Sequence, residues 1–181
     1  MPGTGAAFAG RLSDLAHQAE WGAAIKARAE GRVVLVRGRP VVRYEPLPDD
    51  LRLFRRGLRV LGELFFAAGA ESVEPGVKGF TAELRDPAGL AALEHDGPSS
   101  PSAFSAAVTH MFGTARIGSD PRTSVVSPRF EHHNVARLFV ADSSVFPSNT
   151  GVNPQIAIMA VATLCARSIA GAPTKAPATS T

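Results

Sequence analysis

The chain has 181 residues, of which 45% are hydrophobic, and it carries a formal net charge of +3. This length and composition suit one domain, or one and a fraction, with a real hydrophobic core. The basic residues are scattered rather than gathered between aromatic side chains, so we expect no nucleic-acid binding and no attraction to anionic membranes.

A single cysteine, Cys165, excludes an internal disulfide and is compatible with a reducing compartment. The first twenty residues show no basic start followed by an apolar run, which predicts no signal peptide. The longest apolar stretch, residues 156–166, is interrupted by Thr163 and too short to span a bilayer. We therefore expect a soluble cytoplasmic protein without a membrane span.

The N-terminal part predicts one helix and one hairpin. Apolar residues at helical spacing indicate an amphipathic helix over residues 11–29. Two β-branched runs, 32–36 and 40–44, flank a short glycine-containing link and predict a β-hairpin. Because Pro40 has no N–H, its strand begins at an edge or pairs only after this residue.

The sequence signals for the remaining elements differ in strength. Apolar residues every three or four positions predict a helix over 49–68, with Gly69 as its stop. Residues 71–102 indicate mostly loops, with one possible strand at Phe80–Leu84. A last helix is expected from Pro154 to about Ala170, because proline fits the first helical position. The predicted fold class is α+β: a mainly antiparallel sheet with helices on one face and a C-terminal strand-loop-helix.

Three sequence blocks follow one another in the C-terminal half. They are H110-M-F-G-T-A-R-I-G-S-D-P121 with S124-V-V126, then L138-F-V-A-D-S-S-V-F-P147, then G151-V-N-P-Q155. In this order and at these intervals they resemble the C-terminal signature of the glucose-methanol-choline (GMC) oxidoreductases. The resemblance is strongest to a bacterial branch related to long-chain-alcohol and choline-type enzymes, and the GVNP segment also occurs in cholesterol oxidases. It extends more faintly upstream, so it covers nearly the whole chain, which corresponds to about the last third of a typical member.

The resemblance implies a domain organisation. Residues 1–102 would be the distal part of a substrate-binding domain, and residues 103–171 a segment that contributes the active site and the flavin-facing wall. The segment 172–181 has the composition of a disordered tail.

The resemblance also implies a site and a reaction. His110 matches the family's catalytic histidine, and Asn153 matches a second catalytic position that some members fill with another histidine. FAD would lie against five residues, namely Asp142, Ser143, Asn153, Pro154 and Gln155. The implied enzyme is an alcohol oxidase or dehydrogenase acting on the CH–OH group of a small-molecule alcohol.

The chemistry of these residues agrees with that reaction. Oxidation of an alcohol by a flavin moves a hydride to the flavin N5 while the hydroxyl proton leaves. An imidazole, which titrates near neutrality, suits the proton transfer, and a neutral amide can hold the hydroxyl and favour a developing alkoxide. Asn153 precedes a proline, which biases its backbone to an extended conformation and makes it a candidate helix N-cap. The helix that follows would then point its positive end at the electron-rich flavin.

Structural interpretations stand beside these functional ones. A single histidine such as His110 is often a hydrogen-bonded structural residue, Asn153 can be a mere helix cap, and Asp142 before two serines is commonly a turn or cap. The adjacent pair His132 and His133 is expected in a solvated loop, and no metal site is predicted.

Two other motifs are incomplete. Ser143 or Ser144 with His110 and Asp142 would form a hydrolase triad, but no G-x-S-x-G elbow is present. Gly3-Thr-Gly5 follows no strand and does not extend to G-x-G-x-x-G.

The family's glycine-rich N-terminal βαβ unit, which binds the ADP half of FAD, has no counterpart in this sequence. Three explanations are open: a fragment of a longer gene, a subunit that pairs with a separate FAD-binding chain, or a non-catalytic remnant acting as a binding or structural module. In all three we expect exposed apolar surface on the last helix and on the Leu138–Ala141 strand. The chain should therefore associate with an FAD-binding N-terminal half or with itself.

Overall fold

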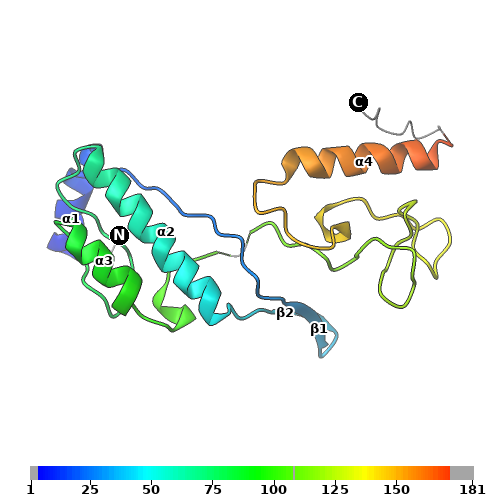
Figure 1. The fold of residues 1–181 in the computed structure, drawn as a ribbon, viewed down its shortest axis with the longest axis horizontal. Coiled ribbons are helices and arrows are strands. Elements are labelled where there is room, and N and C mark those ends of the chain that lie inside the picture. Colours follow the sequence, from blue (N-terminus) through cyan, green and yellow to red (C-terminus); the bar gives the residue numbers. More distant parts are fainter. Residues whose placement is uncertain (1–3, 108, 172–181) are drawn as a thin grey trace, which may run out of the picture. The chain divides into compact units, whose positions relative to one another are not determined.

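The computed structural model describes residues 4–107 and 109–171, so the predicted tail 172–181 lies outside the described residues. The chain divides into two compact units. The first consists of Met1–Ala24 and Arg52–Pro98, and the second of Ile25–Leu51 and Ser99–Thr181 (Figure 1). The functional division that we expected after residue 102 stays a prediction.

The first helix of the first unit is short. Helix α1 covers Ala6–Ser13 and is followed by a 3-10 turn, η1, Leu15–His17. The predicted helix over 11–29 is therefore wrong, because residues 18–31 have no regular structure. Its apolar positions are mainly alanines, which bury little area, whereas Trp21 stacks its ring on Phe65 with centroids 4.8 Å apart.

The predicted helix over 49–68 is confirmed as α2, Pro48–Ala67. A second helix, which we did not predict, packs on it through Leu90 at Gly62. This helix is α3, Pro87–Asp96, where loops were expected. The Asp86 carboxylate accepts a hydrogen bond from the Gly89 N–H at 2.9 Å and caps the start of α3. Leu90 and Leu93 of α3 are fully buried.

The junction of the two helices is tight. A Cβ atom added at Gly62 of α2 would lie 2.8 Å from Leu90 Cδ1. The buried Arg55 guanidinium donates hydrogen bonds to the carbonyls of Glu94, Gly97 and Pro98 at 2.9–3.1 Å, so it closes the C-terminal end of α3.

The second unit contains the predicted hairpin. Strands β1, Arg32–Val36, and β2, Arg39–Arg43, pair antiparallel. Arg37 and Gly38 join them with φ angles of 51° and 75°, as a two-residue type I′ turn requires. Pro40 lies opposite Leu35, one pair away from the turn, where the N–H of a two-residue hairpin points away from the partner strand.

The expected larger sheet is wrong. In the described part of the chain, β1 and β2 form the one sheet, so the fold combines helices with a small two-stranded antiparallel sheet. The predicted strand Phe80–Leu84 is reduced to a bridge between Val73 and Leu84, and the strand Leu138–Ala141 to a bridge between Glu131 and Phe139. Short apolar runs form strands only where a partner lies alongside, and these two runs meet single residues.

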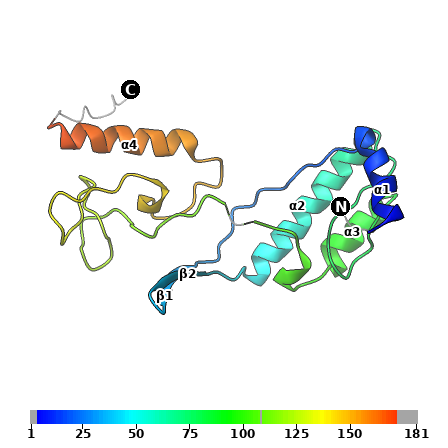
Figure 2. The same cartoon turned by 180° about the vertical axis from the view of Figure 1, so that it is seen from behind.

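Where the structure describes it, the C-terminal part of the second unit consists of loops, two 3-10 turns and one helix. The turns are η2, Pro101–Ala103, and η3, Ser143–Val145, and the predicted last helix is confirmed as α4, Gln155–Ile169. The loops before α4 enclose the buried side chains of Val126 and Val145, and Figure 2 shows this region from behind. Within the described ranges, no helix has both the length and the hydropathy needed to cross a membrane.

Candidate active site

The two residues expected to carry the reaction line the same pocket. His110 and Asn153 share an open pocket of about 330 Å³ with Pro154, Gln155, Ile158 and Met159. The structure thus brings together four of the six predicted site residues, from a loop and from the start of α4. Their catalytic and cofactor-binding roles stay predictions.

His110 stands in a segment that is fixed by its contacts to η3. Its own φ angle of 55° is left-handed, an uncommon conformation for a residue with a side chain. Further along, the Ala115 N–H donates to the Ser144 carbonyl at 3.0 Å. The rings of Phe112 and Phe146 meet edge to face, with centroids 5.8 Å apart. The exposed His110 side chain therefore lies just before residues 112–117, which are held to η3 and Phe146 by ring packing and hydrogen bonds.

The loop before α4 is hydrogen-bonded to a segment of the same unit that is distant in sequence. The Asn149 side-chain amide donates to the Ala27 carbonyl at 2.9 Å. Within the loop, the Thr150 hydroxyl donates to the Val152 carbonyl at 2.7 Å, and Gly151 adopts a φ angle of 70°. These contacts fix the path of the backbone as it approaches Asn153.

Asn153 is not the N-cap of α4, which corrects our expectation. Pro154 occupies the cap position, because its carbonyl accepts the first helical hydrogen bond, from the Ile158 N–H at 2.9 Å. No side chain of the described residues caps this helix start. The Asn153 amide is therefore not used for capping, and beside it lies the positive end of α4, whose first N–H groups have no side-chain acceptor among the described residues.

Asp142 and Ser143 lie elsewhere. The Asp142 carboxylate accepts a hydrogen bond from the Ser144 N–H at 2.8 Å and caps η3, in which Ser143 is the first residue. The structural interpretation of Asp142 as a cap is thus confirmed. Neither residue lines the pocket of His110 and Asn153, and their contact with a cofactor stays a prediction.

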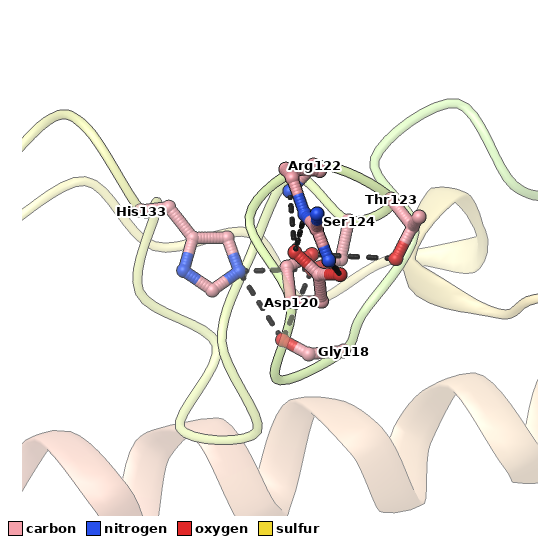
Figure 3. Close-up of polar contacts among 6 residues, drawn as sticks. All are labelled: Gly118, Asp120, Arg122, Thr123, Ser124 and His133. Carbon is pink, nitrogen blue, oxygen red and sulfur yellow. Dashed lines mark hydrogen bonds and ion pairs between the residues drawn. The ribbon is translucent and has the colours of Figure 1, made fainter.

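A second polar cluster surrounds His133, and sequence reasoning missed it (Figure 3). The Ser124 hydroxyl is 2.6 Å from the Asp120 carbonyl and 2.9 Å from His133 Nε2, which also lies 3.2 Å from the Gly118 carbonyl. If the Ser124 hydroxyl donates its proton to the Asp120 carbonyl, the Ser124 oxygen and the Gly118 carbonyl can only accept from His133. The imidazole of His133 must then carry its proton on Nε2 and donate from it. His133 is half-buried and holds this loop together, so its assignment to a solvated loop is wrong.

The same loop is reinforced by an ion pair. The Arg122 guanidinium lies 2.8 Å from the Asp120 carboxylate, and its hydrogen bonds hold the pKa of Asp120 below the ordinary value. Among the described residues, no three histidine, cysteine or carboxylate side chains gather as they would around a metal ion. The hydrogen bonds and the ion pair of Asp120 and His133 support the loop that follows the His110 segment.

Comparison with known proteins identifies the family. The model of the GMC oxidoreductase family, in its C-terminal region, matches residues 27–162. The chain therefore belongs to the GMC oxidoreductases, and it matches their C-terminal domain.

Several relatives share most of this chain. An uncharacterised GMC-type oxidoreductase of Mycobacterium tuberculosis is 36% identical over 162 residues, which are 90% of this chain and 25% of the relative. A paromamine 6′-oxidase of Streptomyces fradiae is 31% identical over 72% of this chain and 20% of its own length. A long-chain-alcohol oxidase of Arabidopsis thaliana is 31% identical over 66% of this chain and 17% of its own length. The chain thus spans about a quarter of the length of the first of these relatives.

Proposed function

We propose that this chain supplies the substrate-facing and flavin-facing part of a GMC-type enzyme that oxidises the CH–OH group of a small-molecule alcohol with FAD. The observation that carries the proposal is the shared pocket of His110 and Asn153 at the start of α4. Membership of the family, and relatives named as oxidases of an alcohol and of paromamine, support the same reaction class.

The residues around the pocket suit a flavin ring. Ile158 and Met159 give one wall an apolar surface, and the open start of α4 offers backbone N–H donors with no acidic residue in its first turn. A flat ring system with an electron-rich edge needs both kinds of surface. When bound, FAD supplies the hydride acceptor. Pro154 and Gln155 would hold it at this helix start, and Asp142 and Ser143 are proposed as further contacts.

Side chains of this chain would transfer the hydroxyl proton and orient the substrate. His110 would accept the hydroxyl proton, since imidazole exchanges protons readily near neutral pH. Asn153 would donate a hydrogen bond from its amide to the substrate oxygen, where negative charge develops. The N–H groups at the start of α4 would favour the additional negative charge of the reduced state.

The exposed surface of α4 supports association with an FAD-binding half. Ile156 is 83% exposed, and Met159 and Ile169 on the same helix are also largely exposed. An apolar surface of this kind is usually covered by another protein surface. We propose that the partner is the N-terminal, FAD-binding part of a GMC oxidoreductase, on the same or a separate chain.

Co-expression with the N-terminal part of the M. tuberculosis relative tests this proposal. We expect a co-purifying complex with flavin absorbance and alcohol-dependent flavin reduction. Replacing His110 with alanine should slow turnover by about 10²- to 10⁴-fold, the usual contribution of a general base. The matched control is His95→Ala, which removes an exposed imidazole from α3 and should leave the rate unchanged. A complex without flavin, with this and other GMC N-terminal parts, would instead favour a non-catalytic binding or structural module.

A further inference from the structure

One buried carboxylate has no role in the reaction proposed above. Asp50, in the first turn of α2, is only 2% exposed. Its two oxygens accept three backbone hydrogen bonds, from the N–H groups of Arg28 at 2.7 Å, Ala29 at 3.0 Å and Leu47 at 3.1 Å. A carboxylate at a helix start commonly accepts from its own helix, whereas two of these donors are more than twenty residues away.

The segment held by Asp50 also contacts the loop of the candidate active site. Directly before Arg28, the Ala27 carbonyl accepts the hydrogen bond from the Asn149 amide. One residue earlier, the stem of Lys26 lies against Gly151, where an added Cβ would be 2.9 Å from Lys26 Cδ. Residues 26–29, which we call the anchor segment, therefore touch Asp50 on one side and the loop before α4 on the other.

We propose that Asp50 is a positioning residue for Asn153, acting through the anchor segment and Asn149. The proposal rests on the proposed function, since it assigns Asn153 to the substrate. Asn149 and Asn153 are four residues apart, and the turn between them is closed by the Thr150 hydroxyl on the Val152 carbonyl. A displacement of the anchor segment would consequently move the Asn153 amide, and a shift of about 1 Å in a substrate-positioning group can cost about 10²-fold in rate.

Three details support the dependence of this link on Asp50. Asn149 Oδ1 is buried and has no hydrogen-bond partner among the described residues, so the donor bond to Ala27 is what orients this side chain. Residues 18–31 have no regular structure, so no helix or sheet ladder holds the anchor segment in place. Burial raises the pKa of Asp50, but hydrogen bonds from Arg28, Leu47 and Ala29 and the charge of Arg28 outweigh it and leave this pKa below 3.8. The side chain is thus a charged acceptor at neutral pH, which strengthens all three bonds.

The test uses the full chain and measures the order of the loop directly. Asp50→Asn keeps the shape of the side chain but replaces one acceptor oxygen with a donor. Asn149→Asp keeps its own shape and turns the donor that faces the Ala27 carbonyl into an acceptor. The controls make the same chemical changes at exposed positions of the same unit, Glu45→Gln and Asn134→Asp.

Backbone ¹⁵N relaxation at Gly151, Val152 and Asn153 is the readout. We expect order parameters near 0.85 in the parent chain and the controls, and a fall to below about 0.6 in both Asp50→Asn and Asn149→Asp. The double variant should be no more mobile than Asn149→Asp alone, because both changes interrupt one path. If Asp50→Asn does not fold, Arg28→Pro is used in its place. Proline has no N–H, so this variant lacks the 2.7 Å hydrogen bond to the Asp50 carboxylate but keeps the bonds from Ala29 and Leu47.

Folded variants that keep the order parameters of the parent chain at these three residues would overturn the proposal, whether or not the protein oxidises alcohols. In the flavin-loaded complex, Asp50→Asn should lower kcat by about 10²-fold with unchanged flavin content and an unchanged pH profile. A role in stability alone would instead reduce the amount of folded, flavin-loaded complex and leave kcat per flavin as it was.

Discussion

Replacing Gly62 with alanine places a methyl group where α2 meets α3. Gly62 is buried, and the new Cβ would lie 2.8 Å from Leu90 Cδ1 and closer still to its Cδ2. Contacts this short force a neighbour to move. Leu90 is 0% exposed, so its side chain has no solvent-filled space to enter.

Two opposing effects determine the change in the free energy of unfolding. Alanine favours a helix interior over glycine by about 1 kcal/mol. An additional carbon in a packed core costs about 1–3 kcal/mol because side chains or helices must shift. Since the contact is with a fully buried leucine, we expect the cost to prevail, and Gly62→Ala to destabilise the first unit by up to about 2 kcal/mol once the helix gain is subtracted.

Trp21 provides the assay. It is the single tryptophan of the chain and stacks on Phe65 of α2, so its fluorescence during urea unfolding reports on the first unit. The control is Gly10→Ala in α1, because a Cβ there meets no described atom within 4 Å and should stabilise by up to about 1 kcal/mol.

A double-mutant cycle gives the decisive comparison. Leu90→Ala alone should cost about 2–5 kcal/mol. In the Gly62→Ala background it should cost less, because the added methyl group occupies part of the vacated space, with a coupling of about 0.5–3 kcal/mol. An additive cycle, or a Gly62→Ala chain stabilised by the full helix gain of about 1 kcal/mol, would show that α2 and α3 do not meet at this point.

Three further predictions concern buried polar groups. Arg55→Lys should destabilise the first unit by about 2–3 kcal/mol in the Trp21 assay, because lysine cannot bond all three carbonyls that end α3. The pKa of Asp50 is lower in the folded state than in the unfolded state, so its carboxylate stabilises the fold at any pH above the ordinary pKa of 3.8. This stabilisation is lost as the pH falls through the pKa of the folded state. The difference in unfolding free energy between the chain and Asp50→Asn should accordingly shrink from pH 7 to about pH 2, and a constant difference would contradict this. Burial raises the pKa of the Cys165 thiol, so alkylation at about pH 8 should be slow in the native chain and fast in denaturant, as mass spectrometry can follow.

The elements that were predictable from sequence are those determined by local residues. Helices α2 and α4 follow apolar periodicity and proline starts, and the hairpin follows β-branched runs around Gly38. Helix α3 was missed because it is short and not amphipathic, although Asp86-Pro87 is a helix-start signal that could have revealed it. The strands expected at 80–84 and 138–141 depend on partners, which no local pattern could supply.

The candidate site was predictable to a similar extent. His110 and Asn153 were found because a family signature placed them, and the structure adds that they line one pocket. The supporting residues could not be found in this way. Asp50 acts on residues 21 and 22 positions away, and Asn149 on a residue 122 positions away. The contact of His133 with Ser124 likewise depends on how two loops fold back on each other.

Each of the two units is made of two separate stretches of the chain, and this limits where the protein can be shortened or recombined. The chain passes between the units after Ala24, Leu51 and Pro98, so neither unit is one uninterrupted stretch of sequence. A shortened protein starting at residue 99 would keep His110 and Asn153 but lose Ala27 and Asp50. Chimeras with relatives should therefore exchange residues 25–51 and 99–171 together, since these two stretches belong to one compact unit.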